Sequence, residues 1–500
     1  MDHVAGGKAV AVSTTIEDLY ETTVGLEIHV ELSTNSKMFC GCAVAFGGDP
    51  NTRTCPVCLG MPGSLPVPNE KAIEYTMRIA LALNCDIARS SLFHRKNYFY
   101  PDMPKNYQIS QYDHPLGSSG YLEIEADRGR TRVGINRVHL EEDTGKSIHM
   151  GGTGRIADSD YSLEDFNRAG TPLVEIVSEP DIRSAEEARV FVTELRALLE
   201  SLDVSDVRME EGSMRVDANV SVRRRGEKEF GAKVEVKNMN SIRSVGRALE
   251  YEEVRQRRAL DAGETLIQET RHFDEKTGTT SSLRTKEFAF DYRYFPEPDL
   301  VPFEPADEWV GRVREELPEL PAARRIRFAE EYGIGDADIS ILTQSKATAD
   351  WFEEAARAYG GQAKKIVNWI IADLFGLLNE AGIELGDSKI APAQLAGLVS
   401  LIDSGKVSGK QAKLVLAGMF ESGADADTVA REKGLEQVSD TGAIEAAVDE
   451  VIAENADAAE KVRAGQANTI GFLVGQVMKK TRGQANPGIV NELLRQKLSS

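Results

Sequence analysis

The sequence predicts an α+β domain followed by an all-helical region. Three observations support this fold class. Residues 20–310 are rich in the two-residue alternation of β-strands, and near residue 310 prolines interrupt both the strand and the helix periodicity of apolar residues. Beyond residue 310 the pattern is helical. A chain of 500 residues is also too long for one ordinary hydrophobic core, so we expect several domains.

The clearest strand pattern is TVGLEIHVEL, residues 23–32. One face carries apolar side chains and the other carries Glu27, His29 and Glu31. The segment RVDANVSVR, residues 215–223, repeats the alternation, with Asp217 and Asn219 opposite its apolar residues. Between such strands, residues 184–202 predict an amphipathic helix that begins with Ser184 and Glu187 at the spacing of a capping box.

These patterns divide the chain into four expected segments. Residues 1–19 read as a mobile extension, 20–310 as the α+β domain, 311–430 as a helical domain, and 431–500 as a last helical unit. The boundary near 310 rests on the prolines between YFPEPDLVPFEP and ELPELP, because proline lacks the N–H donor that helix and sheet interiors need.

Composition limits the possible functions. No apolar run is long enough to cross a bilayer and the first twenty residues do not resemble a signal peptide, so we expect a cytoplasmic protein with no membrane partner. The formal net charge of −21 argues against non-specific binding to nucleic acids. From Lys461 onward, however, basic residues outnumber acidic ones, so this end is suited to a polyanion: Lys461, Arg463, Lys479, Lys480, Arg482, Arg495 and Lys497 against Glu492.

Four of the five cysteines lie in FCGCAVAFGGDPNTRTCPVC. Cys40 and Cys42 form one pair, and Cys55 and Cys58 form the other. The Gly-Gly and Asp-Pro between the pairs let the chain fold back, so that four thiolates meet around a structural zinc ion. The alternative is a set of reduced thiols in a core.

The stretch VHLEEDTGKS, residues 138–147, ends like a phosphate-binding P-loop but has Leu140 where that loop needs glycine. Its carboxylates therefore need another explanation. Glu142 continues the face of Val138 and Leu140, and Glu175 lies between apolar residues in the same way. Together with Glu27 and His29, these acids are suited to magnesium or manganese, although solvated sheet faces and local ion pairs remain the alternative.

Basic and aromatic residues gather in FHRKNYFYPDMPKNYQISQYDHP, residues 93–115. Lys96 and Lys105 could pair with phosphate and the tyrosines could stack on a base, but a structural aromatic cluster explains the pattern equally well. The serines in PLGSSGYL, residues 115–122, lack the activating lysine of amidases, so we expect a turn there.

Long blocks of the chain resemble the GatB family of tRNA-dependent aspartyl/glutamyl amidotransferase subunits. They include GLEIHVEL, HRKNYFYPDMPKNYQISQ, HLEEDTGKS, RAGTPLVEIVSEPDIRS, DVRMEEGSMRVDANVSVR, VEVKNMNS and DYRYFPEPDLVP. The final NTIGFLVGQVMKKTRGQANPGIVNELLRQKL looks like the YqeY-related part of that family. The resemblance implies a cradle-shaped catalytic domain with a mixed, largely antiparallel sheet, a helical domain and a small tRNA-binding tail.

The resemblance also implies the chemistry. Family members use ATP and magnesium to phosphorylate the side-chain carboxylate of Glu-tRNA(Gln) or Asp-tRNA(Asn), and ammonia then displaces the phosphate. The ammonia would come from a separate glutaminase (amidase) subunit, in a complex that also holds a third, small subunit. A non-catalytic tRNA-binding scaffold and a free-standing glutaminase are the alternatives. The first leaves the acidic strand residues unexplained, and the second lacks a nucleophile.

The family pattern implies roles for individual residues. Magnesium would be held by His29, Glu142 and Glu175, with Glu27 and Asp217 as nearby acids. Lys96 and Lys105 would contact phosphate or the path of ammonia. Zinc at the cysteine quartet would be structural, because some members lack those cysteines. Lys479, Lys480 and Arg482 would bind tRNA through its phosphates.

Overall fold

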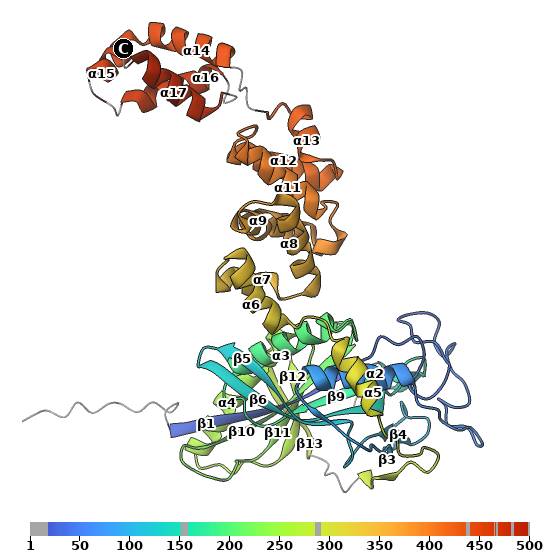
Figure 1. Ribbon diagram of the computed structural model, residues 1–500. Coiled ribbons are helices and arrows are strands. Elements are labelled where there is room, and N and C mark those ends of the chain that lie inside the picture. The colour runs from blue at the N-terminus through green and yellow to red at the C-terminus, as the bar shows by residue number, and fades with distance from the viewer. Residues whose placement is uncertain are drawn as a thin grey trace, which may run out of the picture. The chain divides into compact units, whose positions relative to one another are not determined.

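The structure is a computed structural model that describes residues 19–151, 159–285, 292–436, 441–464, 466, 469–481 and 485–498 (Figure 1). It divides into two compact units, residues 1–321 and 322–500. The expected N-terminal extension, residues 1–19, lies outside the described residues except for Leu19. The first unit is α+β and the second is helical, which confirms the predicted fold class.

Among the described residues, a 12-stranded sheet runs in the order β13-β12-β11-β10-β1-β9-β6-β4-β3-β14; off this path, β5 pairs with β6 and β2 pairs with β5. A separate two-stranded sheet contains β7 and β8. The strands are β1 (Tyr20–Glu31), β2 (Asp86–Ile87), β3 (His94–Asn97), β4 (Tyr107–Ser110), β5 (Gly117–Ala126), β6 (Gly129–Glu142), β7 (Lys146–Met150), β8 (Tyr161–Asp165), β9 (Pro172–Ser178), β10 (Met214–Arg224), β11 (Val234–Met239), β12 (Glu269–Asp274), β13 (Thr279–Thr285) and β14 (Phe295–Pro296).

The sheet is mixed, because β11 and β12 are parallel while β1, β6, β9 and β10 pair antiparallel. The parallel pair needs a crossover, which α4 (Ile242–Asp261) supplies. Residues 117–122, expected to form a turn, instead begin strand β5.

One face of the sheet is apolar and packs against helices. The alternating residues of β1 that were predicted to be buried, among them Leu26, Ile28 and Val30, join a core with α2 (Glu70–Ala82) and α3 (Ala185–Ser201). Helix α3 begins as predicted, with Ser184 Oγ accepting a hydrogen bond from the N–H of Glu187. The Glu187 carboxylate accepts from the N–H of Arg183, one residue earlier than a capping box requires. With this face covered by helices, the opposite face is left to the polar side chains.

The first compact unit ends at residue 321, about ten residues beyond the boundary predicted near residue 310. Helix α5 (Asp307–Glu315) spans it, and Val313 of that helix is fully buried in the core of the first unit. The prolines end the strand-rich part of the chain, but helix α5, which follows the first of them, still packs in the core of the first unit. Sequence periodicity cannot show which core a short amphipathic helix joins.

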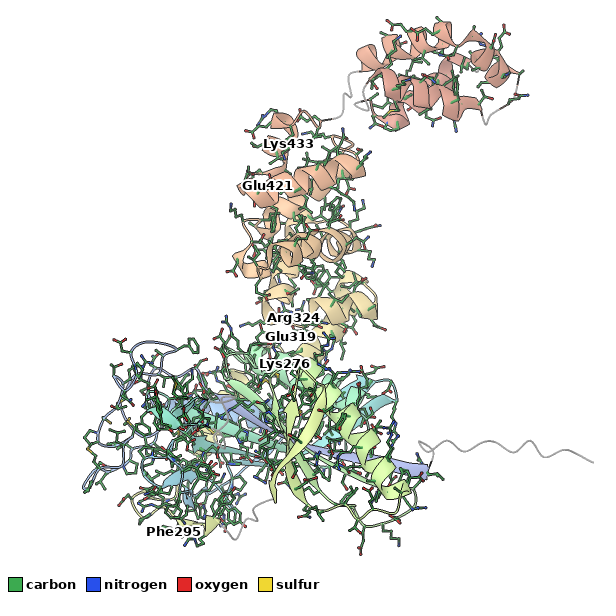
Figure 2. The ribbon with its side chains drawn as sticks, turned by 180° about the vertical axis from the view of Figure 1, so that it is seen from behind. Lys276, Phe295, Glu319, Arg324, Glu421 and Lys433 are labelled. Carbon is green, nitrogen blue, oxygen red and sulfur yellow. The ribbon has the colours of Figure 1, made fainter. Side chains whose placement is uncertain are left out.

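The second unit contains two separate hydrophobic cores. Figure 2 draws the side chains on its helices as sticks. The first core contains buried residues from Phe328 to Ala430, and the second contains residues from Ile444 to Leu498. Helices of the first are α6 (Pro321–Tyr332), α7 (Asp336–Leu342), α8 (Lys346–Tyr359), α9 (Ala363–Asn368), α10 (Phe375–Ala381), α11 (Pro392–Asp403), α12 (Gly409–Ser422) and α13 (Ala426–Glu432). Those of the second are α14 (Thr441–Glu454), α15 (Ala456–Arg463), α16 (Ile470–Lys480) and α17 (Pro487–Leu498).

The apolar run around residues 366–378 forms α9, a turn of π-helix at Trp369–Leu374, and α10. Ile366, Ile370, Leu374 and Leu378 of this run are buried in the core. Over the described residues, no helix has both the length and the apolar character required to cross a bilayer.

A buried ion cluster holds α4 to the sheet. Glu252 is completely buried, and its carboxylate lies 2.8 Å from Nη2 of Arg255 and 3.0 Å from Nε of Arg271 on β12. A buried carboxylate is costly unless it is paired and hydrogen-bonded, and this one is both.

We therefore expect Glu252→Gln to destabilise the first unit by about 2 kcal/mol, because it removes a buried charged acceptor from Arg255 and Arg271 and leaves Glu269 as their remaining carboxylate partner. Glu250→Gln on the same helix is the control, since the Glu250 side chain is 55% exposed and its ion pair with Arg189 spans 3.3 Å. Urea unfolding of both variants measures the difference. Equal stabilities would contradict a structural role for the cluster.

Candidate functional site

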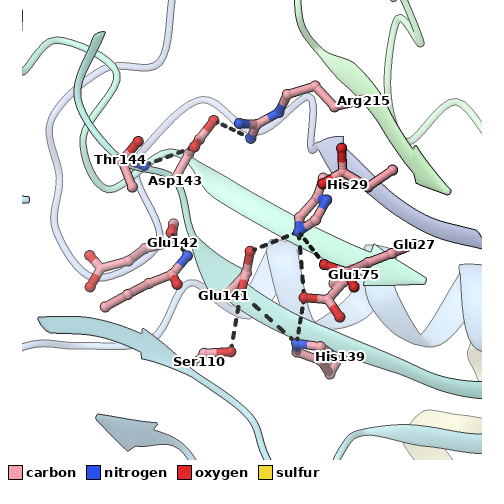
Figure 3. Close-up of polar contacts among 12 residues, drawn as sticks. Glu27, His29, Ser110, His139, Glu141, Glu142, Asp143, Thr144, Glu175 and Arg215 are labelled. Carbon is pink, nitrogen blue, oxygen red and sulfur yellow. Dashed lines mark hydrogen bonds and ion pairs between the residues drawn. The ribbon is translucent and has the colours of Figure 1, made fainter. Parts of the chain in front are cut away.

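The polar face of the main sheet carries a row of three side chains at its centre. The strand register places His29 of β1 opposite Glu175 of β9, and Glu175 opposite His139 of β6. Residues directly opposite one another in antiparallel strands share a face, so the three side chains meet above β9 (Figure 3). Glu27 and Glu141 lie two residues along β1 and β6, on the same face.

The carboxylate of Glu175 is the centre of this cluster. Its Oε2 lies 3.4 Å from Nε2 of His29 and 3.5 Å from Nε2 of His139. Its Oε1 accepts a hydrogen bond of 3.0 Å from Nη2 of Arg137. Only 4% of Glu175 is exposed, so these contacts take place away from bulk water.

Burial and mutual charge shift the ionisation of the cluster. Burial lowers the pKa of His29, but the hydrogen bond to Glu175 and the charges of Glu175, Glu141 and Glu27 outweigh it and raise the pKa to about 9. Burial lowers the pKa of His139 to about 4. Burial opposes ionisation of Glu175, yet the neighbouring histidines hold the pKa of this carboxyl well below its usual value. The cluster thus draws positive charge to His29 at neutral pH.

The same attraction for positive charge suits a divalent cation. Two overlapping sets of possible ligands share Glu175, one with Glu27 and His29 and the other with His139 and Glu141, and the ligand atoms of each set lie within 4.8 Å of one another. Arg137 Nε donates to Nδ1 of His139, at 3.3 Å. Neutral His139 therefore carries its proton on Nε2, the nitrogen that faces Glu175.

His29 is consequently the better imidazole ligand, together with Glu27, Glu175 and Glu141, whose Oε1 is 3.7 Å from Nε2 of His29. Carboxylate oxygens with one imidazole suit magnesium or manganese better than zinc.

Glu142 does not lie with this cluster, and this placement contradicts its assignment to a magnesium shell with His29 and Glu175. It shares the face of Val138 and Leu140, as predicted, but that face is opposite to the one that carries His29. Its carboxylate accepts a hydrogen bond of 2.9 Å from the N–H of Ile109 and pairs with Lys105.

The site residues that sequence reasoning missed are His139, Glu141 and Arg137. They occupy the positions of β6 that alternate with its apolar residues, and this alternation was the available signal. The polar residues on the polar face of β6 lie with the cluster, and the carboxylate on its apolar face, Glu142, lies apart from it.

Two predicted residues flank the cluster. Asp217 of β10 is opposite Glu27 in register, and its Oδ2 accepts a hydrogen bond of 2.6 Å from Nζ of Lys237. On the other side, burial lowers the pKa of Lys96, but the charges of Glu141 and Glu175 outweigh it and raise the pKa. Lys96 thus places a cation beside the two buried carboxylates.

Lys105 and Glu142 lie in a pocket of about 160 Å³. Its wall includes Cys58 and Gly60 of the cysteine segment and Arg95 of β3. The sequence predicts one shared role for Lys105 and Lys96, contact with phosphate or ammonia. The structure separates them, since Lys96 lies beside the central cluster and Lys105 pairs with Glu142 in this pocket.

The four cysteines of the predicted zinc site lie together. All four sulfurs are within 4.8 Å of one another, and those of Cys55 and Cys58 are 3.9 Å apart. Sulfurs around tetrahedral zinc are about 3.8 Å apart, so the arrangement fits the metal. A hydrogen bond from Cys40 lowers the pKa of the Cys58 thiol to about 4, whereas the same hydrogen bond raises the pKa of Cys40 and burial raises that of Cys42 to about 11. Without metal, the quartet therefore favours a thiolate at Cys58 and thiols at Cys40 and Cys42.

The predicted tRNA-binding residues lie at the end of α16. Lys479 is exposed, whereas Nζ of Lys480 lies 2.6 Å from the carboxylates of both Glu450 and Glu454 on α14. Arg482 lies outside the described residues. Part of the positive charge of this end is therefore balanced by neighbouring acids.

Comparison with known proteins covers nearly all of the chain. Residues 22–311 match the GatB/GatE catalytic domain and residues 350–498 match the GatB domain. The GatB-type subunit of the aspartyl/glutamyl-tRNA(Asn/Gln) amidotransferase from Carboxydothermus hydrogenoformans is 54% identical over 480 residues, which cover 96% of this chain and 99% of that protein. The proteins of the same name from Moorella thermoacetica and Brevibacillus brevis are 53% and 50% identical, over 96% of this chain and 100% and 99% of theirs. The chain therefore belongs to the GatB family.

Proposed function

We propose that this chain is the GatB subunit of a tRNA-dependent amidotransferase, a carbon–nitrogen ligase that converts Glu-tRNA(Gln) or Asp-tRNA(Asn) to the amide with ATP. Membership of the family supports the amidotransferase assignment. The buried cluster around Glu175 supports the ATP-dependent step, since a non-catalytic scaffold has no need for carboxylates and imidazoles held together away from water.

The chemistry requires two steps because a carboxylate is a poor electrophile. In the first, a side-chain oxygen of the aminoacyl group bonds to the γ-phosphorus of ATP, and the bond from that phosphorus to ADP breaks. In the second, ammonia attacks the acyl carbon, the bond to phosphate breaks, and the nitrogen loses a proton. Such reactions depend on position and charge stabilisation more than on covalent help from the protein.

The residues of the central cluster would hold magnesium through His29, Glu27, Glu141 and Glu175. Bound magnesium would neutralise phosphate oxygens and orient them for in-line transfer. Arg137 fixes Glu175 through its 3.0 Å hydrogen bond, and Lys96 supplies a cation for a phosphate group at the edge of the cluster.

We assign Lys105 and Glu142 to the path of ammonia. They are separated from the cluster by strand β6, whose adjacent residues Glu141 and Glu142 point to opposite faces. A pocket lined by an ion pair suits a small polar molecule better than a nucleotide. The ammonia would come from a partner glutaminase (amidase) subunit, in a complex with a third, small subunit, and the cytoplasm is the expected location.

Glu141→Gln and Glu142→Gln provide a paired test of these assignments. We expect Glu141→Gln to lower ATP cleavage that depends on misacylated tRNA by roughly a hundredfold or more, because it removes a charge from the metal shell. Glu142→Gln should preserve this ATP cleavage and lower amidation with glutamine, while added ammonium restores the amide. The assembled complex is assayed for ATP cleavage, amide formation and glutaminase rate. If Glu142→Gln lost ATP cleavage and Glu141→Gln kept it, the two assignments would have to be exchanged.

Zinc at the cysteine quartet gives a further prediction. Purified protein should contain about one zinc ion per chain, and Cys55→Ser with Cys58→Ser should abolish it and lower the stability of the first unit, because metal-binding free energy is folding free energy. Cys85→Ala is the control, since Cys85 lies in the apolar core away from the quartet. Protein that is free of zinc under reducing conditions would refute the prediction.

Another prediction concerns the tail, residues 431–500. Its separate core begins at Ile444, whereas Leu435 packs against the preceding core, so removal of residues 437–500 should leave the rest folded. We expect the truncated complex to bind aminoacyl-tRNA more weakly and with a smaller dependence on salt, because fewer phosphates are neutralised. Titrations at several salt concentrations measure both effects. Unchanged affinity would exclude the tail from tRNA binding.

A further inference from the structure

The cysteine segment touches the Lys105 side chain directly. Gly60 follows Cys58 by two residues and has φ +65°, in the left-handed region. A methyl group at Gly60 would overlap Cγ of Lys105 and would lie 3.1 Å from both Cβ and Cδ. The backbone at Gly60 is therefore packed against the aliphatic stem of Lys105, at a distance that no side chain at residue 60 allows.

The same segment is tied to the rest of the pocket. The backbone hydrogen bonds from Leu59 to Cys55 and from Gly60 to Val57, of 3.1 and 3.0 Å, fold the segment into a compact turn around the second cysteine pair. Nζ of the buried Lys37 lies 3.7 Å from Sγ of Cys58 and donates to the carbonyl of Phe166 at 3.1 Å. The quartet is thus anchored on one side and touches Lys105 on the other.

Lys105 needs such support because its side chain is long and flexible. A lysine side chain has a flexible stem of four carbons, and an ion pair at its ammonium group does not by itself select one conformation of that stem. Glu142 is held by the N–H of Ile109, so its position is fixed by the sheet. The position of the Lys105 stem is limited by its contact with Gly60, which follows Cys58 by two residues.

We propose that the cysteine quartet, through Gly60, is the positioning element for the Lys105 and Glu142 pair, with Gly60 as its positioning residue. The functional consequence rests on the proposed function, in which this pair lies on the path of ammonia. In the metal-bound quartet the turn is rigid and Lys105 is confined against Glu142. Without metal the turn loosens, and the ammonium group of Lys105 is released from a single position.

Gly60→Ala tests the proposal, and Gly63→Ala is its matched control. Both glycines lie in the same segment with positive φ, +65° and +85°, so both substitutions strain the backbone. Nothing lies within 4 Å of a methyl group at Gly63. Any difference between the two variants therefore reports the collision with Lys105 rather than strain.

Three measurements are made on the assembled complex: zinc content, amidation with glutamine or with added ammonium, and the rate at which an amine-reactive reagent labels Lys105, determined by mass spectrometry. Lys71 of α2, whose side chain is 49% exposed, is the internal reference for labelling. We expect Gly60→Ala to retain zinc, to label faster at Lys105 only, and to lose roughly tenfold to a hundredfold of glutamine-dependent amidation, because small displacements in a site have effects of this size. Gly63→Ala should resemble the unchanged protein.

Equal behaviour of the two variants in labelling would overturn the proposal. If Gly60→Ala loses its zinc, the unchanged protein treated with a chelator decides the matter: faster labelling of Lys105 supports the positioning, and unaltered labelling refutes it. Faster labelling with unaltered amidation from both nitrogen sources would support the positioning and count against the proposed role of the pair in delivering ammonia. The two ideas can therefore fail separately.

Discussion

The antiparallel register of β6, β9 and β1 is the constraint on which the central cluster depends. It brings His139, Glu175 and His29, which are far apart in sequence, into one row across three strands. Because side chains alternate between faces, a shift of one residue in either pairing would turn part of the row toward the helices and place charges in an apolar core. The register is in turn selected by the apolar face, where Ile28, Val174, Ile176 and Leu140 are buried. Hydrophobic packing on one side of the sheet thus determines the chemistry on the other.

The cost of burying these charges is offset by neighbours on adjacent strands rather than by water. Arg137 binds Glu175, Lys237 binds Asp217, and Lys96 lies beside Glu141 and Glu175. In the metal-free protein the remaining deficit of positive charge is met by a proton on His29, whose pKa is raised to about 9. A divalent cation would displace that proton and take over the same electrostatic role.

The strands, the cysteine quartet and the first core could be predicted from the sequence, because period-two alternation and paired cysteines are local signals. The same signals identify Glu27, His29 and Glu175. They favour Glu142 over Glu141, because a carboxylate on an apolar face suggests a compensating cation. The cation is a lysine, Lys105, which no local pattern connects to it. Likewise, the end of the first unit depends on where the short helix α5 packs, and this is decided by tertiary contacts with α2.

Adjacent positions on one strand give the proposed reaction its spatial order. Glu141 faces the cluster that would activate the carboxylate, and Glu142 faces the pocket assigned to ammonia. Both are held by the same few residues of β6 and β4, since Ser110 donates to Glu141 and the N–H of Ile109 donates to Glu142. A displacement of this strand end would therefore move both carboxylates together. If ammonia passes the second while the acyl phosphate forms beside the first, the two steps share one rigid support, and neither can be repositioned independently of the other.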